Sequence, residues 1–316
     1  MRSSNKIMSD TKIKSQNIIS DENESNSSSS FLKFLIALIK NKWALISVFW
    51  LFFIIIVAIF ASEISPLDPN KNHIMERVSP PLTLDKKGDM KYLIGSDALG
   101  RDSLSRLIYG AQVSLLVGFS AVFIGGIIGT LLGIFAGYYG RLTDDIIMRL
   151  ADIQLAFPFI LLAILFLIVL GEGLINLILV LGVGQWVTYA RIARAQTISQ
   201  KEKEYVEAAK ALGVNNLSIM FGSILPNIFA PLIVIASFNV ASVILAEAAL
   251  SFLGLGVPPQ IPTWGAMLAE SRDHIFAKRW WLPFFPGMAI LITVLAFNIV
   301  GDWLRDYLDP RLKEIE

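Results

Sequence analysis

The chain has 316 residues and a net charge of +1; 54% of its residues are hydrophobic and 17% are charged. A soluble domain has about a quarter charged residues, so this composition favours a membrane protein. The nearly neutral charge argues against a nucleic-acid-binding surface, which would need a basic face. The absence of cysteine excludes disulfide scaffolds, cysteine metal sites and thiol nucleophiles. The two histidines, His73 and His274, have no neighbours at metal-ligand spacing and are interpreted as ordinary loop residues.

The hydrophobic residues are concentrated in long stretches. A helix needs roughly 20 apolar residues to cross about 30 Å of hydrocarbon, and six stretches meet that length. They are residues 43–61, 113–138, 153–170, 174–195, 228–250 and 284–303. Lipid offers no partner for open backbone groups, so each stretch is predicted to be a helix. The first is too long for the core of a signal peptide and is predicted to be a retained anchor.

The basic residues predict the orientation of these helices. Lys33, Lys40 and Lys42 precede the first stretch, and no Lys or Arg follows it until Lys71. The positive-inside rule therefore places the N-terminus in the cytoplasm, and six crossings place the C-terminus there as well. Three basic residues in a predicted outer loop do not fit this rule: Arg272, Lys278 and Arg279.

The same pattern divides the chain into regions. The predicted boundaries are a disordered cytoplasmic tail at 1–30, an anchor helix at 31–62, an extracytoplasmic loop at 63–110, a multi-spanning core at 111–305 and a cytoplasmic C-terminus at 306–316. The segment 95–110 is amphipathic, and its polar face carries Asp97, Arg101, Asp102 and Arg106. Two placements remain open for this segment, along the outer membrane surface or against a partner.

The second stretch contains a row of glycines at four-residue spacing: Gly125, Gly129, Gly133 and Gly137. These positions share one helix face, and each glycine costs about 1 kcal/mol relative to alanine in a helix interior. Rows of small residues let membrane helices approach closely. We expect this face to pack against another helix, either within this chain or in a partner subunit.

The connection between the fourth and fifth stretches carries a second pattern. Tyr205, Ala208, Ala209 and Leu212 lie at i, i+3, i+4 and i+7, which predicts a short amphipathic helix with Gly213 as its C-terminal cap. A second short helix is predicted over 216–224, before Pro226 opens the fifth stretch. Spacing alone leaves two placements equally open, at the membrane surface or docked on a partner protein.

Several motifs in this connection and elsewhere in the chain resemble those of a known protein family. Glu207-Ala208-Ala209, then Gly213 and Leu225-Pro226, have the spacing of the EAA loop of ATP-binding-cassette importer permeases, with Ser223 at a position that is usually apolar. Three more segments resemble the subgroup that imports peptides and nickel: GSDALGRDSLSRLIYGAQVSLLVG from Gly95, ILAEAALSFLGLGVPPQIPTWG from Ile244 and GDWLRDYLDPRL from Gly301. Together they resemble the second, C-type permease of dipeptide and oligopeptide systems.

The resemblance implies an all-α integral membrane fold of the type I importer class, with six transmembrane helices and a cytoplasmic coupling helix. It implies a second homologous permease subunit, two cytoplasmic ATPases and an extracytoplasmic binding protein as partners. The chain has no phosphate-binding loop of the G-x-x-x-x-G-K-[ST] type, so ATP is expected on the partner subunits and no cofactor on this chain. Residues 204–213 would form the coupling helix, with Ala208 and Ala209 as the close contact, Glu207 as a polar anchor and Gly213 as the turn.

The transport pathway is less clearly marked. Asn239, Glu247 and Asn298 are polar residues inside predicted membrane helices, where such groups are costly and often functional. For Glu247 we favour a structural hydrogen bond to the next loop over a pathway role. Peptides are the first choice of cargo and nickel the second. An ion-driven secondary transporter is the main alternative class, although it would need no docking helix.

Overall fold

The computed structural model describes residues 32–84, 90–274 and 277–308. The predicted disordered tail at 1–30 and most of the predicted C-terminal region therefore lie outside the described residues. The contacts divide the chain into two units, residues 1–46 and 47–316. In the first unit, residues 32–40 form a helix, and the Asn41 side chain accepts a hydrogen bond from the Ala44 backbone N–H at 3.1 Å.

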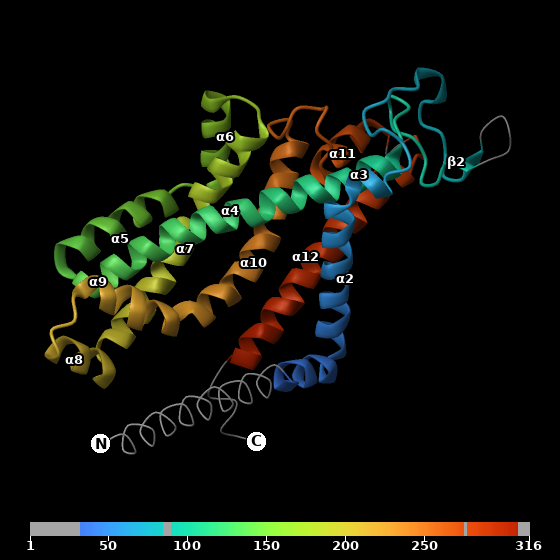
Figure 1. Ribbon diagram of the computed structural model, residues 1–316. Coiled ribbons are helices and arrows are strands. Elements are labelled where there is room, and N and C mark those ends of the chain that lie inside the picture. Colours follow the sequence, from blue (N-terminus) through green and yellow to red (C-terminus); the bar gives the residue numbers. More distant parts are fainter. Residues whose placement is uncertain (1–31, 85–89, 275–276, 309–316) are drawn as a thin grey trace, which may run out of the picture. The chain divides into compact units, whose positions relative to one another are not determined.

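The described residues form mostly helices, with two short strands before α4 (Figure 1). They are α2 (Lys42–Ile59), α3 (Ala61–Ile64), η1 (Ile74–Glu76), β1 (Thr83–Leu84), β2 (Met90–Tyr92), α4 (Ser103–Tyr139), α5 (Arg141–Leu155), α6 (Phe159–Leu170), α7 (Leu174–Lys201), α8 (Glu204–Ala211), α9 (Asn216–Ser218), η2 (Ile219–Ile224), α10 (Leu225–Phe252), α11 (Trp264–Ser271), η3 (Arg272–His274) and α12 (Trp281–Leu308). Strands β1 and β2 form an antiparallel hairpin. Within the described residues, five helices are long and apolar enough to cross a membrane, and α5 with α6 would make a sixth.

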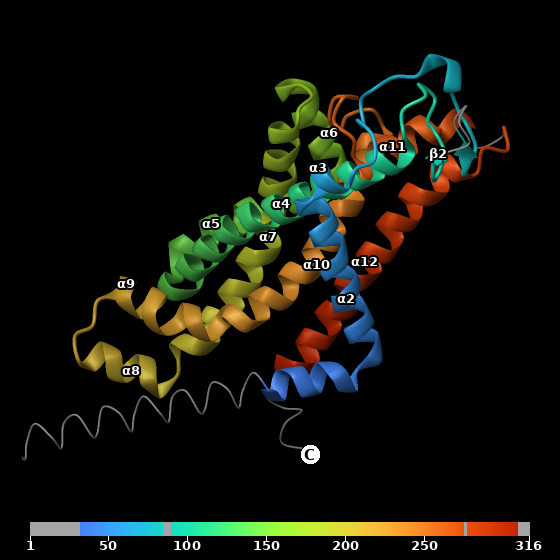
Figure 2. The same cartoon turned by 45° about the vertical axis from the view of Figure 1, so that its right-hand side comes forward.

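The third predicted span is broken. The stretch 153–170 was expected to be one helix, but α5 and α6 are bent by 88° relative to each other (Figure 2). Pro158 lies at this break, where its ring and its missing N–H prevent a continuous helix. Helix α6 has 12 residues and is therefore about 18 Å long, too short to span the hydrocarbon alone.

The second span begins earlier than expected. Helix α4 starts at Ser103, because the Asp102 carboxylate accepts a hydrogen bond from the Ser105 backbone N–H at 2.8 Å and caps the helix. The end of the segment 95–110 is therefore the first part of a 37-residue helix.

The predicted short helix at 216–224 is also not separate. The Asn215 side chain accepts a hydrogen bond from the Ser218 backbone N–H at 2.7 Å, and the helix that it caps continues through α9 and η2 into α10. Residues 219–224 wind as a π-type turn before Pro226. Proline removes one helical hydrogen-bond donor, and a local change of winding accommodates that loss without ending the helix.

The core of the second unit is built on α4 packed along α7. The glycine row faces α7: a Cβ on Gly129 would lie 2.2 Å from the Trp186 carbonyl oxygen, and one on Gly133 would lie 2.4 Å from the Ala190 carbonyl oxygen. The other two glycines of the row, Gly125 and Gly137, approach the carbonyl oxygens of Gly182 and Arg194 in the same way. The contact that these glycines make is thus within this chain.

Candidate partner-docking and pathway sites

Helix α8 exposes most of its surface. Val206 is its buried residue and Ala209 is half-buried, while Glu207 and Ala208 are exposed. Of the predicted apolar face, Ala209 is half-buried, whereas Tyr205, Ala208 and Leu212 are exposed, so most of this face is open to a partner or to the membrane surface. Val206, which the predicted face does not include, is the residue that packs the helix against the core.

The end of α8 is fixed by its backbone. Gly213 has φ of +76°, in the left-handed region that residues with a Cβ seldom adopt. The Gly213 N–H donates to the Lys210 carbonyl at 3.0 Å, and the Val214 N–H donates to the Ala209 carbonyl at 3.1 Å. This pair of bonds is the Schellman motif, which closes a helix C-terminus. Gly213 therefore sets the direction in which the chain leaves α8, as its predicted cap position requires.

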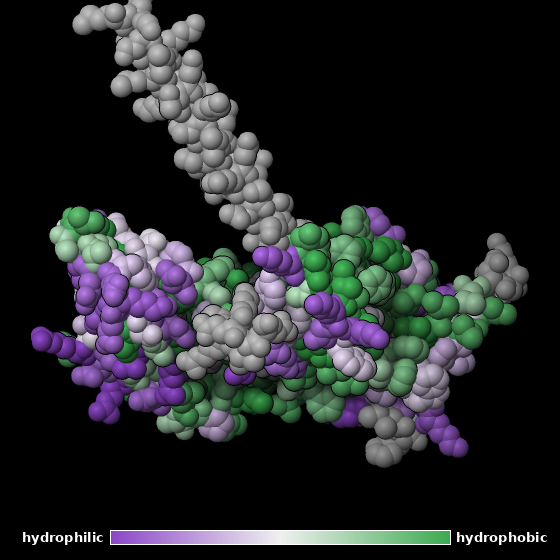
Figure 3. Space-filling view, turned by 90° about the horizontal axis from the view of Figure 1, so that it is seen from below, coloured by the Kyte–Doolittle hydropathy of each residue, from purple (hydrophilic) through white to green (hydrophobic). Residues whose placement is uncertain are grey.

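The surroundings of α8 are strongly polar. Figure 3 shows the molecule from below, with hydrophilic side chains gathered on the side where α8 lies. Charged residues in and beside α8 supply this surface: Glu202, Lys203, Glu204, Glu207 and Lys210. Nearby, the Tyr205 hydroxyl donates to the Gln200 side-chain oxygen at 2.9 Å. An exposed helix on a charged surface fits contact with water and a soluble protein better than contact with lipid tails.

Of the three predicted pathway residues, Glu247 lies deepest. Its side chain is fully buried and accepts hydrogen bonds from the hydroxyls of Ser251 at 2.7 Å and Ser114 at 3.4 Å. It therefore joins α10 to α4. The two asparagines lie on different helices: Asn239 is buried on α10 and Asn298 is half-buried on α12.

A groove of about 590 Å³ between α7, α10 and α12 was not anticipated from the sequence. Its polar lining residues are Gln196, Gln200, Asn227 and Arg305. Among the described residues that line it, none is a predicted pathway residue. The amides come from helices that the sequence treats as separate spans, so no local pattern marks their convergence.

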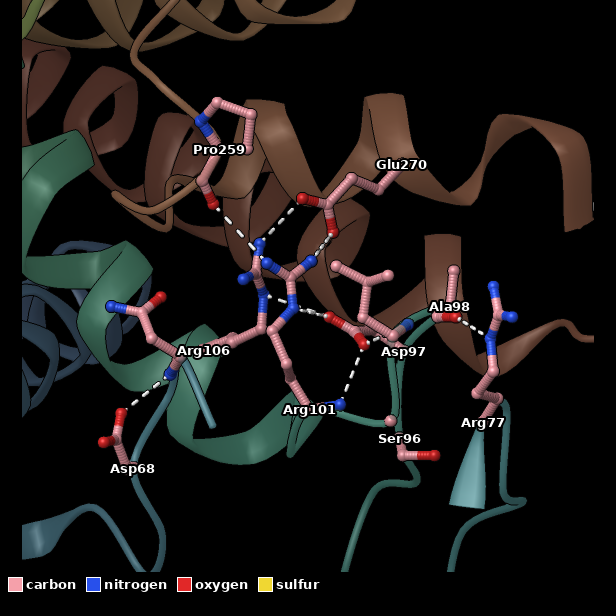
Figure 4. Close-up of polar contacts among 12 residues, drawn as sticks. Asp68, Arg77, Ser96, Asp97, Ala98, Arg101, Arg106, Pro259 and Glu270 are labelled. Carbon is pink, nitrogen blue, oxygen red and sulfur yellow. Dashed lines mark hydrogen bonds and ion pairs between the residues drawn. The ribbon is translucent and has the colours of Figure 1, made fainter. Parts of the chain in front are cut away.

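A buried charge cluster lies where α4 begins (Figure 4). The Asp97 carboxylate pairs with the Arg101 guanidinium at 2.6 Å. The Glu270 carboxylate of α11 accepts hydrogen bonds from the guanidinium groups of Arg101 at 2.7 Å and Arg106 at 2.9 Å. The Arg106 side chain is fully buried. The polar face of the segment 95–110 therefore points into this chain and contacts α11. Glu270 was missed because it lies more than 160 residues along the chain from either arginine.

Two family models match the chain. Residues 129–314 match the family described as "Binding-protein-dependent transport system inner membrane component". Residues 30–81 match the family described as "N-terminal TM domain of oligopeptide transport permease C".

Curated relatives match over most of both chains. The "Di/tripeptide transport system permease protein DppC" of Pseudomonas aeruginosa is 45% identical over 86% of this chain and 89% of its own length. The "Dipeptide transport system permease protein DppC" of Haemophilus influenzae is 42% identical over 87% of this chain and 92% of its own length. The "Glutathione transport system permease protein GsiD" of Escherichia coli is 41% identical over 87% of this chain and 88% of its own length.

A solved structure supports the fold. The inward-facing MetNI methionine ABC transporter matches with a TM-score of 0.53, covering 65% of this chain and 97% of that chain at 19% sequence identity. The five to six candidate spans and this likeness confirm the predicted all-α type I importer fold. The chain therefore belongs to the binding-protein-dependent transport system inner membrane components and is a multi-pass permease subunit of an ATP-binding-cassette importer.

Proposed function

We propose that this chain forms half of the pathway by which di- or oligopeptides cross the cytoplasmic membrane. A second homologous permease subunit forms the other half. Two cytoplasmic ATPase subunits supply the energy, and an extracytoplasmic binding protein delivers the peptide. The names of the relatives, which include di- and tripeptide permeases, support peptide cargo.

The observation that carries the proposal is the exposure of α8. It presents Glu207 and Ala208 outward, while Val206 holds its other side against the core. The small Ala208 side chain lets the helix backbone approach a partner closely, and Glu207 offers a charged anchor. In this proposal α8 is the coupling helix, which sits in a cleft of one ATPase subunit and follows its movement.

The proposal also fixes the orientation of the chain. Helix α8 and both termini lie in the cytoplasm, in agreement with the basic residues before the first span. The hairpin β1–β2 and α11 then lie outside, on the side where a binding protein approaches. Asn239 and Asn298 remain candidate pathway residues, whereas the hydrogen bonds of Glu247 support a structural role.

A charge reversal on α8 tests the docking. We expect Glu207→Lys in the complete importer to lose ATPase subunits during purification and to lose peptide uptake. The matched control is Asp273→Lys, which reverses an exposed acidic residue on the α11 side and should leave the ATPase subunits bound. If Glu207→Lys retains the ATPase subunits and normal uptake, α8 is not the coupling helix.

Two replacements of Gly213 distinguish a requirement for the left-handed backbone conformation from a requirement for a small side chain. A Cβ at this position would meet no atom within 4 Å, so any loss in a variant comes from the left-handed backbone or from the docked partner. Asparagine tolerates the left-handed region and valine does not. We expect Gly213→Val to reduce uptake strongly and Gly213→Asn to retain most of it, measured as peptide uptake by vesicles that contain the complete importer. Equal, normal uptake in both variants would contradict a fixed turn at this position.

The cargo is tested by uptake of labelled dipeptides, tripeptides and nickel ions into the same vesicles, with the matching binding protein present. We expect ATP-dependent uptake of peptides. Uptake of nickel without peptides would instead support the second cargo. Uptake by this chain alone, driven by an ion gradient, would overturn the importer proposal.

A further inference from the structure

Tyr138 lies at the point where α4 meets the coupling segment. It is the penultimate residue of α4, and its side chain is 7% exposed. Its neighbour Tyr139 is 47% exposed. The glycine row ends directly before it at Gly137, so the end of α4 is already held against α7 at this level. The ring of Tyr138 is therefore fixed on the side of α4 and reaches the connection that contains α8.

Three parts of the connection contact this one residue. Before α8, the Lys201 ammonium donates to the Tyr138 carbonyl oxygen at 3.0 Å. Within α8, the Lys210 ammonium lies over the Tyr138 ring, 5.7 Å from its centre. After α8, the Tyr138 hydroxyl donates to the Asn216 side-chain oxygen at 2.8 Å.

These contacts differ in kind, but each links the end of α4 to the segment that contains α8. Lys201 supplies a positive charge and a donor to a carbonyl in the last turn of α4, where helix carbonyls lack partners and the helix dipole is negative. Lys210 is attracted to the electron-rich ring face. The Asn216 bond fixes the start of the helix that continues into α10. Lys210 is the contact that lies in α8 itself, and Lys201 and Asn216 hold the two helices that α8 connects, so displacement of α8 acts on Tyr138 directly through Lys210 and through the chain on either side.

We propose that Tyr138 is a positioning residue that couples the movement of α8 to α4. This inference rests on the proposed function, because it takes α8 to be the helix moved by the ATPase. When the nucleotide sites close and shift α8, Tyr138 carries the shift to the end of α4. The close packing along the glycine row then passes it to α7, since a well-packed interior transmits strain.

The test compares Tyr138→Phe with Tyr139→Phe in the complete importer in vesicles. The first variant removes the hydroxyl that bonds Asn216 and keeps the ring under Lys210. The second removes a hydroxyl from the exposed neighbour. We expect Tyr138→Phe to lower the number of peptides transported per ATP hydrolysed by about fivefold, the factor for one hydrogen bond. ATPase subunits should stay bound. Tyr139→Phe should match the wild type.

The acceptor side gives an independent variant set. Asn216→Asp keeps an oxygen acceptor and should keep the wild-type number of peptides transported per ATP hydrolysed. Asn216→Ala should lower this number as much as Tyr138→Phe does. The double variant Tyr138→Phe/Asn216→Ala should be no worse than either single one, because both remove the same bond. Asn216 is exposed, so Asn216→Ala decides the question even if Tyr138→Phe fails to assemble.

The results separate the two claims. If Glu207→Lys releases the ATPase but Tyr138→Phe and Asn216→Ala both keep the wild-type ratio, this inference is wrong and the coupling helix stands. Multiplied losses in the double variant also overturn it, because they show independent effects. If Glu207→Lys keeps a working ATPase complex, the proposed function fails first, and the inference falls with it.

Discussion

The two ends of α4 are held by different kinds of interaction. Where α4 begins, Arg106 is fully buried and pairs with Glu270 of α11. Near the end of α4, two ion pairs join α5 to α7 and include no fully buried side chain: Arg191–Asp152 has side chains 49% and 59% exposed, and Arg194–Asp144 has side chains 34% and 18% exposed. We refer to these as the α11 end and the α8 end.

The difference has mechanical consequences. Breaking a buried ion pair leaves an unpaired charge in a medium that cannot solvate it, which is strongly destabilising. Exposed and partly exposed pairs contribute less, because water can solvate a charge that has lost its partner. The α11 end should therefore keep one arrangement. Besides the ion pair between α4 and α11, the buried Glu247 connects α10 to α4 at this end. The α8 end can shift at low cost, as a helix driven by a partner requires.

The largest expected effect is at the α11 end. Asp97→Leu removes the carboxylate that Arg101 and Arg106 both approach, at 2.6 and 3.5 Å. We expect a loss of about 3–5 kcal/mol of stability, measured as a lower melting temperature in detergent. Asp273→Leu, in an exposed pair with Arg272, should change stability by no more than about 0.5 kcal/mol. Equal melting temperatures for the two variants would remove the distinction between the ends.

The next effect concerns the packing that joins the ends. In Gly129→Ala the new Cβ would lie 2.2 Å from the Trp186 carbonyl oxygen, so α4 and α7 must separate, and we expect a loss of about 1–3 kcal/mol. In Gly126→Ala the nearest atoms are the Tyr189 ring carbons at 3.6 Å. That control should be neutral or gain up to about 1 kcal/mol from helix propensity. A stable Gly129→Ala with unchanged melting would show that the contact can relax.

A smaller effect is expected at the α8 end. Asp144→Asn removes the charge that pairs with Arg194, where the second contact of this pair is 2.6 Å long. We expect a loss of about 0.2–1 kcal/mol, because the pair is partly exposed. Melting in low and high salt checks the cause: the difference from the wild type should shrink in high salt. A loss as large as that of Asp97→Leu would contradict a compliant α8 end.

The smallest effect is a pH dependence in the loop before α4. The hydrogen bond from Lys91, 2.5 Å long, lowers the pKa of Glu76 below its ordinary value of 4.5, and a second bond comes from Tyr92. A lowered pKa means that ionised Glu76 stabilises the folded loop above pH 4.5, and this contribution is lost as pH falls through the folded pKa. Melting between about pH 5 and pH 3 should therefore fall slightly more for the wild type than for Glu76→Gln. The opposite order would mean that the carboxylate is not stabilised there.

Local patterns in the sequence predicted the glycine row of α4 and the C-terminal cap of α8. The four-residue glycine spacing and the cap at Gly213 both reflect backbone geometry within one helix, so the residues alone indicate them. The break between α5 and α6 was also marked, by Pro158, but the long apolar stretch around it favoured one continuous span. At Val206 a single buried contact decided which face of α8 turns inward, and no period reveals that.

The α11 end could not be predicted in the same way. Arg101 and Arg106 are visible as charges beside an apolar stretch, but their partner Glu270 comes from a distant helix. Only the packed fold brings the three together. The same holds for the contacts of Tyr138 with Lys201 and Asn216, which join the ends of separate helices.

The central claim is that α8 carries the movement of an ATPase subunit into this chain. The most direct measurement places a photo-crosslinking residue at the exposed position of Ala208 in the complete importer, with the same residue at Met75, which is 98% exposed in the loop before α4, as the control. From position 208 we expect a crosslinked product of this chain with an ATPase subunit, with a yield that changes when ATP is added, and from position 75 we expect none. Crosslinks from position 208 to lipid alone, or equal ATPase crosslinks from both positions, would contradict it.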